Sequence, residues 1–142
     1  IKNVMAIATG INDGLRLGAN SRAALITRGL AEIARMGKLM GGRSETFMGL
    51  TGVGDLLLTC TDDQSRNRRA GLGLGSGKLL PQVLSDIGQV VEGVGTTREV
   101  FHKSLELGIE MSITTEVYRV LFEDKSPQLA VRDLLKRDPI RE

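Results

Sequence analysis

The chain has 142 residues, the length of one domain, and is long enough to bury a core without disulfides or a structural metal. Its 19 Lys and Arg residues against 17 Asp and Glu residues give a net charge of +2, too small to predict nucleic-acid binding by the whole surface, so any anion site must be local. The single cysteine, the single histidine and the lack of a long apolar run argue against a disulfide, a Cys/His metal site and a membrane span, and they favour a cytoplasmic setting.

Apolar residues at helical spacing predict helices along most of the chain, beginning with a glycine-interrupted helix over residues 2–15. A longer amphipathic helix is predicted from Asn20 to Met40, with Asn20 or Ser21 as its N-cap and Gly41-Gly42 as its stop. Its apolar stripe consists of Ala23, Ile26, Leu30, Ile33 and Met40. Residues 49–77 show no such clear period, and their structure stays open.

Three further helical patterns follow in the C-terminal third of the chain. A glycine, Gly108, is expected to end the first, and Ser126-Pro127 supplies a cap and a first-turn proline for the last. The apolar stripes are Val94, Phe101 and Leu105; then Ile113, Val117, Val120 and Leu121; then Val131, Leu134 and Leu135. No segment shows sustained strand alternation, so the predicted fold class is an all-α helical bundle.

The glycine series Gly71, Gly73, Gly75 and Gly77 suggests a dinucleotide-binding loop. Such a loop requires a strand before it and a helix after it, within a βαβ unit, and no strand is predicted here. We therefore interpret these glycines as loop residues that form turns between helices.

Asp55 follows two glycines inside the apolar run "LTGVGDLLLTCT". An ionised carboxylate in such a run is costly unless something hydrogen-bonds to it, so Asp55 needs a partner. Two roles stay open: an aspartate that caps a helix, or a carboxylate that orients a lysine or a substrate hydroxyl.

The segment "SRNRR" begins at Ser65, which can cap a helix whose N-terminal N–H groups attract an anion. Arg66 can then add a two-pronged contact to phosphate oxygens, and Asn67 offers both a donor and an acceptor. This set suits a small phosphorylated molecule. A solvated basic helix face stays open as the alternative, whereas RNA is disfavoured because no aromatic residue adjoins the arginines.

Lys2 opens the chain in "IKNVMAIATG". If Lys2 lies in the first turn of a helix, partial burial and the positive end of the helix dipole would both lower the pKa of its ammonium group. A lowered pKa suits a proton donor. The alternative is an ordinary solvated lysine. Cys60 and His102 have no activating neighbour in sequence and are expected to be structural. Because the chain begins at Ile1, we expect it to be a piece of a longer protein.

Several long segments together resemble one known family. They are "KNVMAIATGINDGLRLGANSRAALITRGLAEIARMG", "ETFMGLTGVGDLLLTCTDDQSRNRRAGLGLG", "IGQVVEGVGTTREV" and "YRVLF". In their order they are similar to the C-terminal domain of bacterial-type NAD(P)-dependent glycerol-3-phosphate dehydrogenase, and the resemblance spans nearly the whole chain. It implies a helical substrate-binding domain over residues 1–142, like the C-terminal domain of 6-phosphogluconate dehydrogenase.

The resemblance also implies roles for individual residues. Lys2 matches the family's proton-transferring lysine, which protonates the alkoxide formed when hydride reaches the carbonyl of dihydroxyacetone phosphate. Asp55 matches the aspartate of the family's "GDL" segment, a substrate-site residue. Ser65, Arg66 and Asn67 match its "SRN" triplet, which lies against the substrate.

The same resemblance implies contacts with NAD or NADP. Arg66 matches a residue that also reaches the cofactor, and Val90 and Glu92 of "VVEG" match positions that touch it. Arg68 and Arg69 are read as flanking charge. The family's dinucleotide-binding domain, with its own lysine and most of the cofactor site, is not in this sequence, so the chain by itself is expected to be inactive.

The expected activity is the interconversion of dihydroxyacetone phosphate and sn-glycerol 3-phosphate, a precursor of phospholipids in this family. Two alternatives stay open: a non-catalytic helical module that serves association, and the helical domain of another hydroxyacid dehydrogenase. A phosphorylated small molecule is the expected partner, a homodimer stays open, and neither nucleic acid nor a membrane is expected.

Overall fold

The computed structural model describes residues 1–39 and 50–136, and all regular secondary structure within these ranges is helical. The described helices are α1 (Lys2–Gly14), α2 (Ala19–Leu39), α4 (Leu50–Thr61), α5 (Arg66–Gly75), α6 (Leu80–Ile87), α7 (Glu92–Leu107), α8 (Ser112–Phe122) and α9 (Pro127–Lys136). The all-α prediction is confirmed for these residues.

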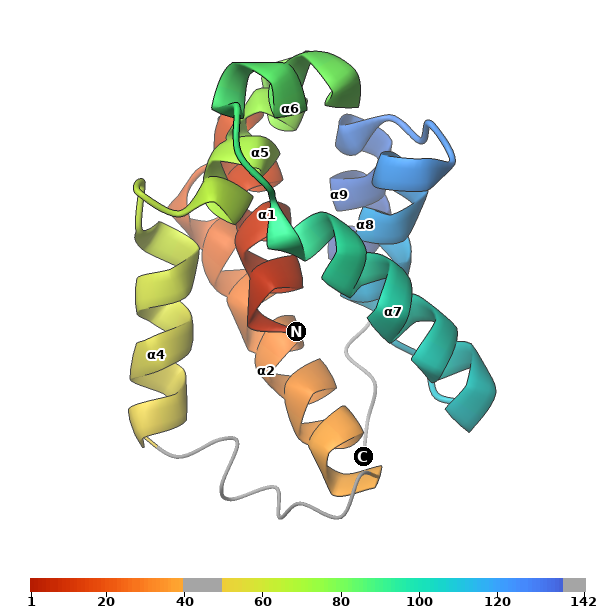
Figure 1. Cartoon of the computed structure of the whole chain (residues 1–142). Helices are drawn as coiled ribbons and strands as arrows, with labels where there is room; N and C mark the ends of the chain where they lie inside the picture. The colour runs from red at the N-terminus through yellow and green to blue at the C-terminus, as the bar shows by residue number, and fades with distance from the viewer. Residues whose placement is uncertain (40–49, 137–142) are drawn as a thin grey trace.

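Helix α1 runs through the middle of the bundle (Figure 1) and packs against α2, α4, α5, α7, α8 and α9. Its central residues, Val4 to Asn12, are all buried. This follows from the sequence, because the helix is apolar on nearly every side, as a fully surrounded helix must be. The core around it is completed by Leu25 of α2, Leu56 of α4 and Ile113 of α8.

The glycine series is where the sequence-based interpretation was wrong. Gly71, Gly73 and Gly75 lie inside α5, and only Gly77, with φ +106°, lies in a turn. Gly71 and Gly75 face α1 so closely that a Cβ on Gly71 would clash with the Ile7 carbonyl oxygen. Glycine is poor in a helix interior, but here its missing side chain allows two backbones to touch.

The ends of several helices were predicted correctly. Gly108 caps α7 in the left-handed conformation with φ +67°, and α9 begins at Pro127. The N-cap prediction for α2 was wrong, because the helix already begins at Ala19, after Gly18 with φ +99°. Met40 and the predicted stop at Gly41-Gly42 lie outside the described residues.

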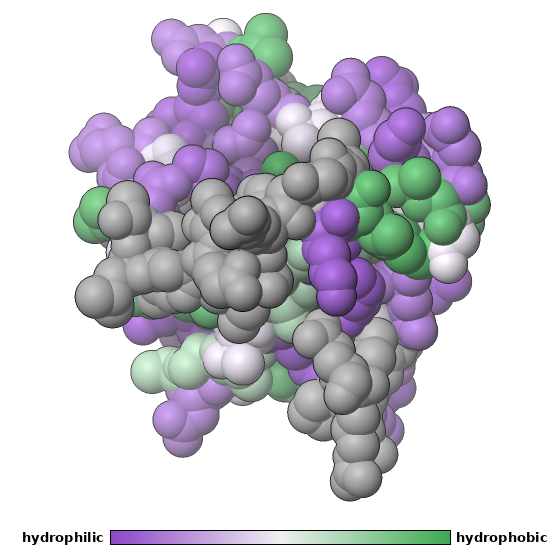
Figure 2. Space-filling view, turned by 90° about the horizontal axis from the view of Figure 1, so that it is seen from below, coloured by the Kyte–Doolittle hydropathy of each residue, from purple (hydrophilic) through white to green (hydrophobic). Residues whose placement is uncertain are grey.

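On the face seen from below, the part of the surface that is coloured is mostly hydrophilic, and the most extensive of its apolar areas lies on the right of the view, the side on which α7 ends (Figure 2). Leu105, in the last turn of α7, is 64% exposed. None of the described helices is both long and apolar enough to cross a membrane.

Candidate functional site

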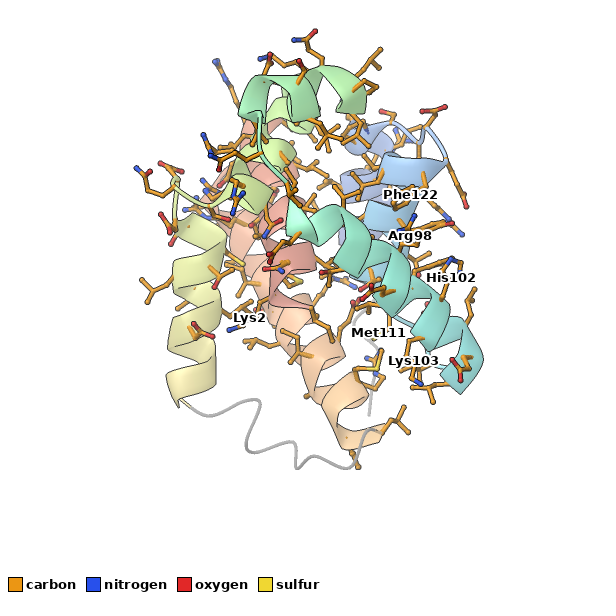
Figure 3. The ribbon with its side chains drawn as sticks, viewed as in Figure 1. Lys2, Arg98, His102, Lys103, Met111 and Phe122 are labelled. Carbon is orange, nitrogen blue, oxygen red and sulfur yellow. The ribbon has the colours of Figure 1, made fainter. Side chains whose placement is uncertain are left out.

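Lys2 and Asp55 form an ion pair between α1 and α4, in which Lys2 Nζ donates to Asp55 Oδ2. Lys2 is the first residue of α1 and lies on the side of that helix facing α4 (Figure 3). Asp55 lies in the second turn of α4, so the helix-capping role was wrong, and the carboxylate instead meets a lysine. The side chains of Lys2 and Asp55 are 53% and 52% exposed, so the partial burial expected for Lys2 is not found in this chain.

Ser65 is the N-cap of α5, as predicted. Its Oγ accepts a 3.2 Å hydrogen bond from the backbone N–H of Arg68, and its own backbone is extended, with φ −64° and ψ 124°. This satisfies one of the N–H groups that a helix start leaves without a partner. The next two residues, Arg66 and Asn67, therefore occupy the first turn of α5, at its positive dipole end.

A hollow of about 280 Å³ brings together five of the predicted residues. It is lined by Gln64, Ser65, Arg66, Asn67, Val90 and Glu92. Gln64 was missed by sequence reasoning, and its only signal was its position next to the triplet. Val90 is 74% exposed, which is unusual for an apolar side chain and gives the hollow an uncovered apolar wall.

Gly93 connects this hollow with the first turn of α1. Its backbone N–H donates a 2.7 Å hydrogen bond to Asn67 Oδ1. A Cβ at position 93 would lie 2.6 Å from that oxygen, 2.7 Å from Ile7 Cδ1 and 3.1 Å from the carbonyl oxygen of Asn3, the residue after Lys2. The first turns of α1, α5 and α7 therefore meet at one glycine, which joins the hollow to the helix that begins with Lys2. Neither Lys2 nor Asp55 lines the hollow itself.

The charges around the hollow favour an anion with one exception. The N-termini of α5 and α7 both open onto it, and Arg66, which is exposed, adds a guanidinium. The bond from the Gly93 N–H to Asn67 Oδ1 fixes the orientation of the Asn67 amide, and its Nδ2 group remains available as a donor. Glu92 is the exception: its carboxylate in the first turn of α7 can accept hydrogen bonds from hydroxyl or amide groups.

Arg68 is not the flanking charge that the sequence suggested. Its residue exposure is only 7%, and its guanidinium bonds to Asp13 Oδ2 at 2.8 Å, to Asp63 Oδ1 at 3.0 Å and to the Cys60 carbonyl oxygen at 3.0 Å. Burial alone would raise the pKa of Asp13, but hydrogen bonds from Arg68, Asn12 and Arg22 outweigh it and hold that pKa below its ordinary value. Arg69, by contrast, is exposed.

Cys60 and His102 lie apart from the site's polar groups. The thiol of Cys60 is fully buried, and burial raises its pKa, which leaves it a poor nucleophile. His102 stands with Arg98 and Phe122 on the outer side of α7 and α8, away from Lys2 (Figure 3), and its ring lies 5.6 Å from that of Phe101. Among the described residues, no group of three His, Cys, Asp or Glu residues is placed to hold a metal ion.

The fold and the site define an all-α domain that carries a lysine–carboxylate pair and an anion-favouring hollow. A family model described as NAD-dependent glycerol-3-phosphate dehydrogenase C-terminus matches residues 1–132. The chain belongs to this family of dehydrogenase C-terminal domains.

Curated relatives agree with this assignment. The chain is 55% identical over 138 residues to glycerol-3-phosphate dehydrogenase [NAD(P)+] of Vibrio cholerae, covering 97% of this chain and 40% of the relative. The same enzyme of Photobacterium profundum is also 55% identical, with 97% and 41% covered. The chain thus spans about two fifths of the length of the relatives it matches.

Solved structures show the same fold. A crystal structure of glycerol-3-phosphate dehydrogenase from Coxiella burnetii superposes with a TM-score of 0.92 at 54% identity, covering 96% of this chain and 42% of the other. Glycerol-3-phosphate dehydrogenase GPD1 from Saccharomyces cerevisiae gives a TM-score of 0.85 at 28% identity, covering 96% and 40%.

Proposed function

We propose that this chain is the substrate-binding part of an enzyme that interconverts dihydroxyacetone phosphate and sn-glycerol 3-phosphate with NAD(P), and so supplies a phospholipid precursor. The observation that carries this proposal is the meeting of the first turns of α1, α5 and α7 at Gly93, because it joins the helix that begins with Lys2 to the hollow lined by Arg66 and Asn67. The names of the relatives support the same activity for the longer proteins.

The substrate's phosphate would bind at the start of α5. Arg66 offers two parallel N–H groups that match phosphate oxygens, and the N-terminal end of α5 adds its dipole. The Nδ2 amide of Asn67, oriented by its bond to Gly93, donates to a substrate oxygen. These contacts hold a three-carbon ester so that its carbonyl faces the Lys2 side of the site.

Lys2 supplies the proton in the reduction direction. When hydride adds to the carbonyl carbon, the C=O π electrons move to oxygen, and Lys2 Nζ–H gives that oxygen its proton; in the oxidation direction Nζ, then neutral, takes it back. Asp55 holds Nζ in place through their ion pair and balances the positive charge of the ammonium form. Such an arrangement, a proton donor oriented by a second group, is typical of acid–base catalysis.

The residues around the hollow fit one end of NAD or NADP. Arg66 matches a phosphate, the exposed Val90 offers an apolar wall for a ring, and Glu92 can accept from an amide or a ribose hydroxyl. A bound NAD(P)H supplies the hydride. The remaining cofactor contacts would come from a nucleotide-binding domain, and we therefore propose that the chain is inactive without one. A cytoplasmic location and a homodimer stay predictions.

The test is an NADH and NADPH oxidation assay on this chain alone and on the chain joined to the nucleotide-binding domain of the Vibrio cholerae relative. We expect the joined protein to reduce dihydroxyacetone phosphate and the chain alone to be inert. Unphosphorylated dihydroxyacetone is the matched control substrate, and we expect its kcat/KM to be much lower because it lacks the group that Arg66 binds. Equal turnover of both ketones would reject the phosphate assignment.

A further inference from the structure

We propose that Arg68 is a positioning residue: its single buried guanidinium fixes the relative placement of the three helices that carry Lys2, Asp55 and the Arg66–Asn67 turn. This inference rests on the proposed function, because it assigns Arg68 a part in holding that site together. Arg68 itself does not line the hollow.

Each bond of the Arg68 guanidinium reaches a different part of the chain. Nη1 contacts Asp13 Oδ2 of α1 at 2.8 Å and donates to the Cys60 carbonyl oxygen of α4 at 3.0 Å. Nε donates to Asp63 Oδ1, in the connection between α4 and α5, at 3.0 Å. Arginine presents Nε and Nη1 at a fixed separation in one rigid plane, whereas a lysine carries its three N–H donors on a single nitrogen and cannot reproduce that separation.

The bond to Cys60 ties the C-terminal end of α4 to α5. The carbonyl of Cys60 is among the last four of α4, which have no N–H partner within the helix. It accepts from Arg68 and, at 3.3 Å, from Thr9 Oγ1 of α1. Asp55 lies about one and a half turns before Cys60 on the same rigid helix, so fixing this carbonyl also fixes the Asp55 end of the Lys2–Asp55 pair.

The bond to Asp13 ties α5 to α1. Asp13 is also held by Arg22 of α2 at 3.1 Å, and its side chain is only 14% exposed. The Arg68–Asp13 pair is therefore little weakened by water, unlike the ion pairs at the surface. Arg68 is two residues after Arg66, and its backbone N–H also closes the Ser65 cap, so a shift of Arg68 moves the whole turn that forms the hollow.

A positioning role and a purely structural role predict different kinetics. A variant that only unfolds part of the enzyme lowers the amount of active protein, which lowers Vmax and leaves KM unchanged. A variant that displaces the Arg66–Asn67 turn in folded enzyme also raises KM, because the substrate contacts themselves are misplaced. A rise in KM therefore indicates the positioning role, whereas a fall in Vmax alone indicates the purely structural role.

The experiment uses the active joined enzyme with Arg68→Ala, Arg68→Lys and Asp63→Asn. We expect Arg68→Ala to raise KM for dihydroxyacetone phosphate at least about tenfold and to lower kcat, and Arg68→Lys to recover only part of the loss. Asp63→Asn, which weakens one bond of three, should raise KM less. Millimolar guanidinium ion should restore part of the activity of Arg68→Ala by occupying the vacated position between Asp13 and Cys60.

Two control variants keep the result interpretable. Arg69→Ala removes the exposed neighbouring arginine and should change neither parameter. Val131→Ala, in the core at α9, should lower thermal stability with KM unchanged. If Arg68→Ala does not fold, Arg68→Lys and Asp63→Asn still decide the question, and an unchanged KM in the variants that fold would overturn the proposal.

An independent measurement separates this inference from the proposed activity. The Gly93 amide hydrogen is bonded to Asn67, so its exchange rate reports whether the α5 turn is in place. We expect Arg68→Lys in the chain as it stands to speed exchange at Gly93 at least about tenfold, and Val131→Ala to leave it close to the wild-type rate. If the joined wild-type enzyme is inactive, the proposed function fails; if Gly93 exchange is unchanged in Arg68→Lys, the positioning role fails.

Discussion

The backbone N–H of Gly93 donates to Asn67 Oδ1 at 2.7 Å, and this bond joins the first turns of α7 and α5 across 26 residues of sequence. The absence of a side chain at position 93 makes the bond sterically feasible, because α7 there approaches both α5 and α1. The shape of the hollow therefore depends on a glycine that lies outside the "SRN" triplet.

The substitution Gly93→Ala should push α7 away from Asn67. Its Cβ would lie 2.6 Å from Asn67 Oδ1 and 2.7 Å from Ile7 Cδ1, closer than real Cβ contacts. We expect the free energy of unfolding, measured in urea, to fall by about 1–3 kcal/mol. Gly95→Ala is the control in the same helix: nothing lies within 4 Å of its added Cβ, so the gain in helix propensity should stabilise the chain by up to about 1 kcal/mol.

The substitution Gly71→Ala should be more damaging, because its Cβ would meet the backbone of α1 rather than a side chain. Gly10 Cα would lie 2.9 Å away, and neither helix can yield without separating. We expect a loss of about 3 kcal/mol or more in urea unfolding. Gly54→Ala, in α4 with open space around the added Cβ, is the matched control. A loss for Gly71→Ala no larger than for Gly54→Ala would contradict the packing argument.

Glu32 should make stability depend on pH around neutrality. Burial raises the pKa of its carboxyl from 4.5 to about 7, although hydrogen bonds from the backbone of Ile113 and Thr114 oppose the shift. The folded chain therefore binds more protons than the unfolded chain between these values, so stability is full below the lower pKa and falls as pH rises through 7.

The expected loss from Glu32 between about pH 5 and pH 8 is up to about 3 kcal/mol in the free energy of unfolding. Urea unfolding of wild type and Glu32→Gln at both pH values measures it. Glutamine keeps an oxygen that can accept from the Ile113 N–H, at 2.5 Å in the wild type, but does not titrate. A pH dependence equally steep in Glu32→Gln would show that another group is responsible.

Lys2→Ala in the joined enzyme should lower kcat by about 10² or more, because it removes the proton donor that we propose for the reaction. Steady-state kinetics with dihydroxyacetone phosphate measure the effect. Lys38→Ala, an exposed lysine in the last turn of α2, is the control and should leave kcat unchanged. A merely twofold fall for Lys2→Ala would reject the role of proton donor.

Arg66→Ala should act chiefly on KM. The lost hydrogen bonds to a charged phosphate correspond to a rise in KM for dihydroxyacetone phosphate of about 10- to 100-fold. KM for unphosphorylated dihydroxyacetone should change little, because that ketone never used the contact. Arg69→Ala serves as the control, and an unchanged KM in Arg66→Ala would end the phosphate assignment.

The sequence by itself determined the helices and several of their ends, because these depend on neighbours three or four residues apart. The apolar stripe of α8, the left-handed Gly108, Pro127 at the start of α9 and the Ser65 cap are all local features. The resemblance to a known family also named the residues that line the hollow, apart from Gln64.

Only the tertiary structure decided which of these residues meet. Gly71 looked like a loop residue because its low helix propensity is visible locally, whereas the contact with α1 that requires it is not. Arg68 looked solvated because a charged residue beside two other arginines normally is, yet Asp13 lies 55 residues earlier in the chain and is the partner that allows its burial. The pairing of Lys2 with Asp55 depends in the same way on how α1 and α4 pack, and no local pattern records that packing.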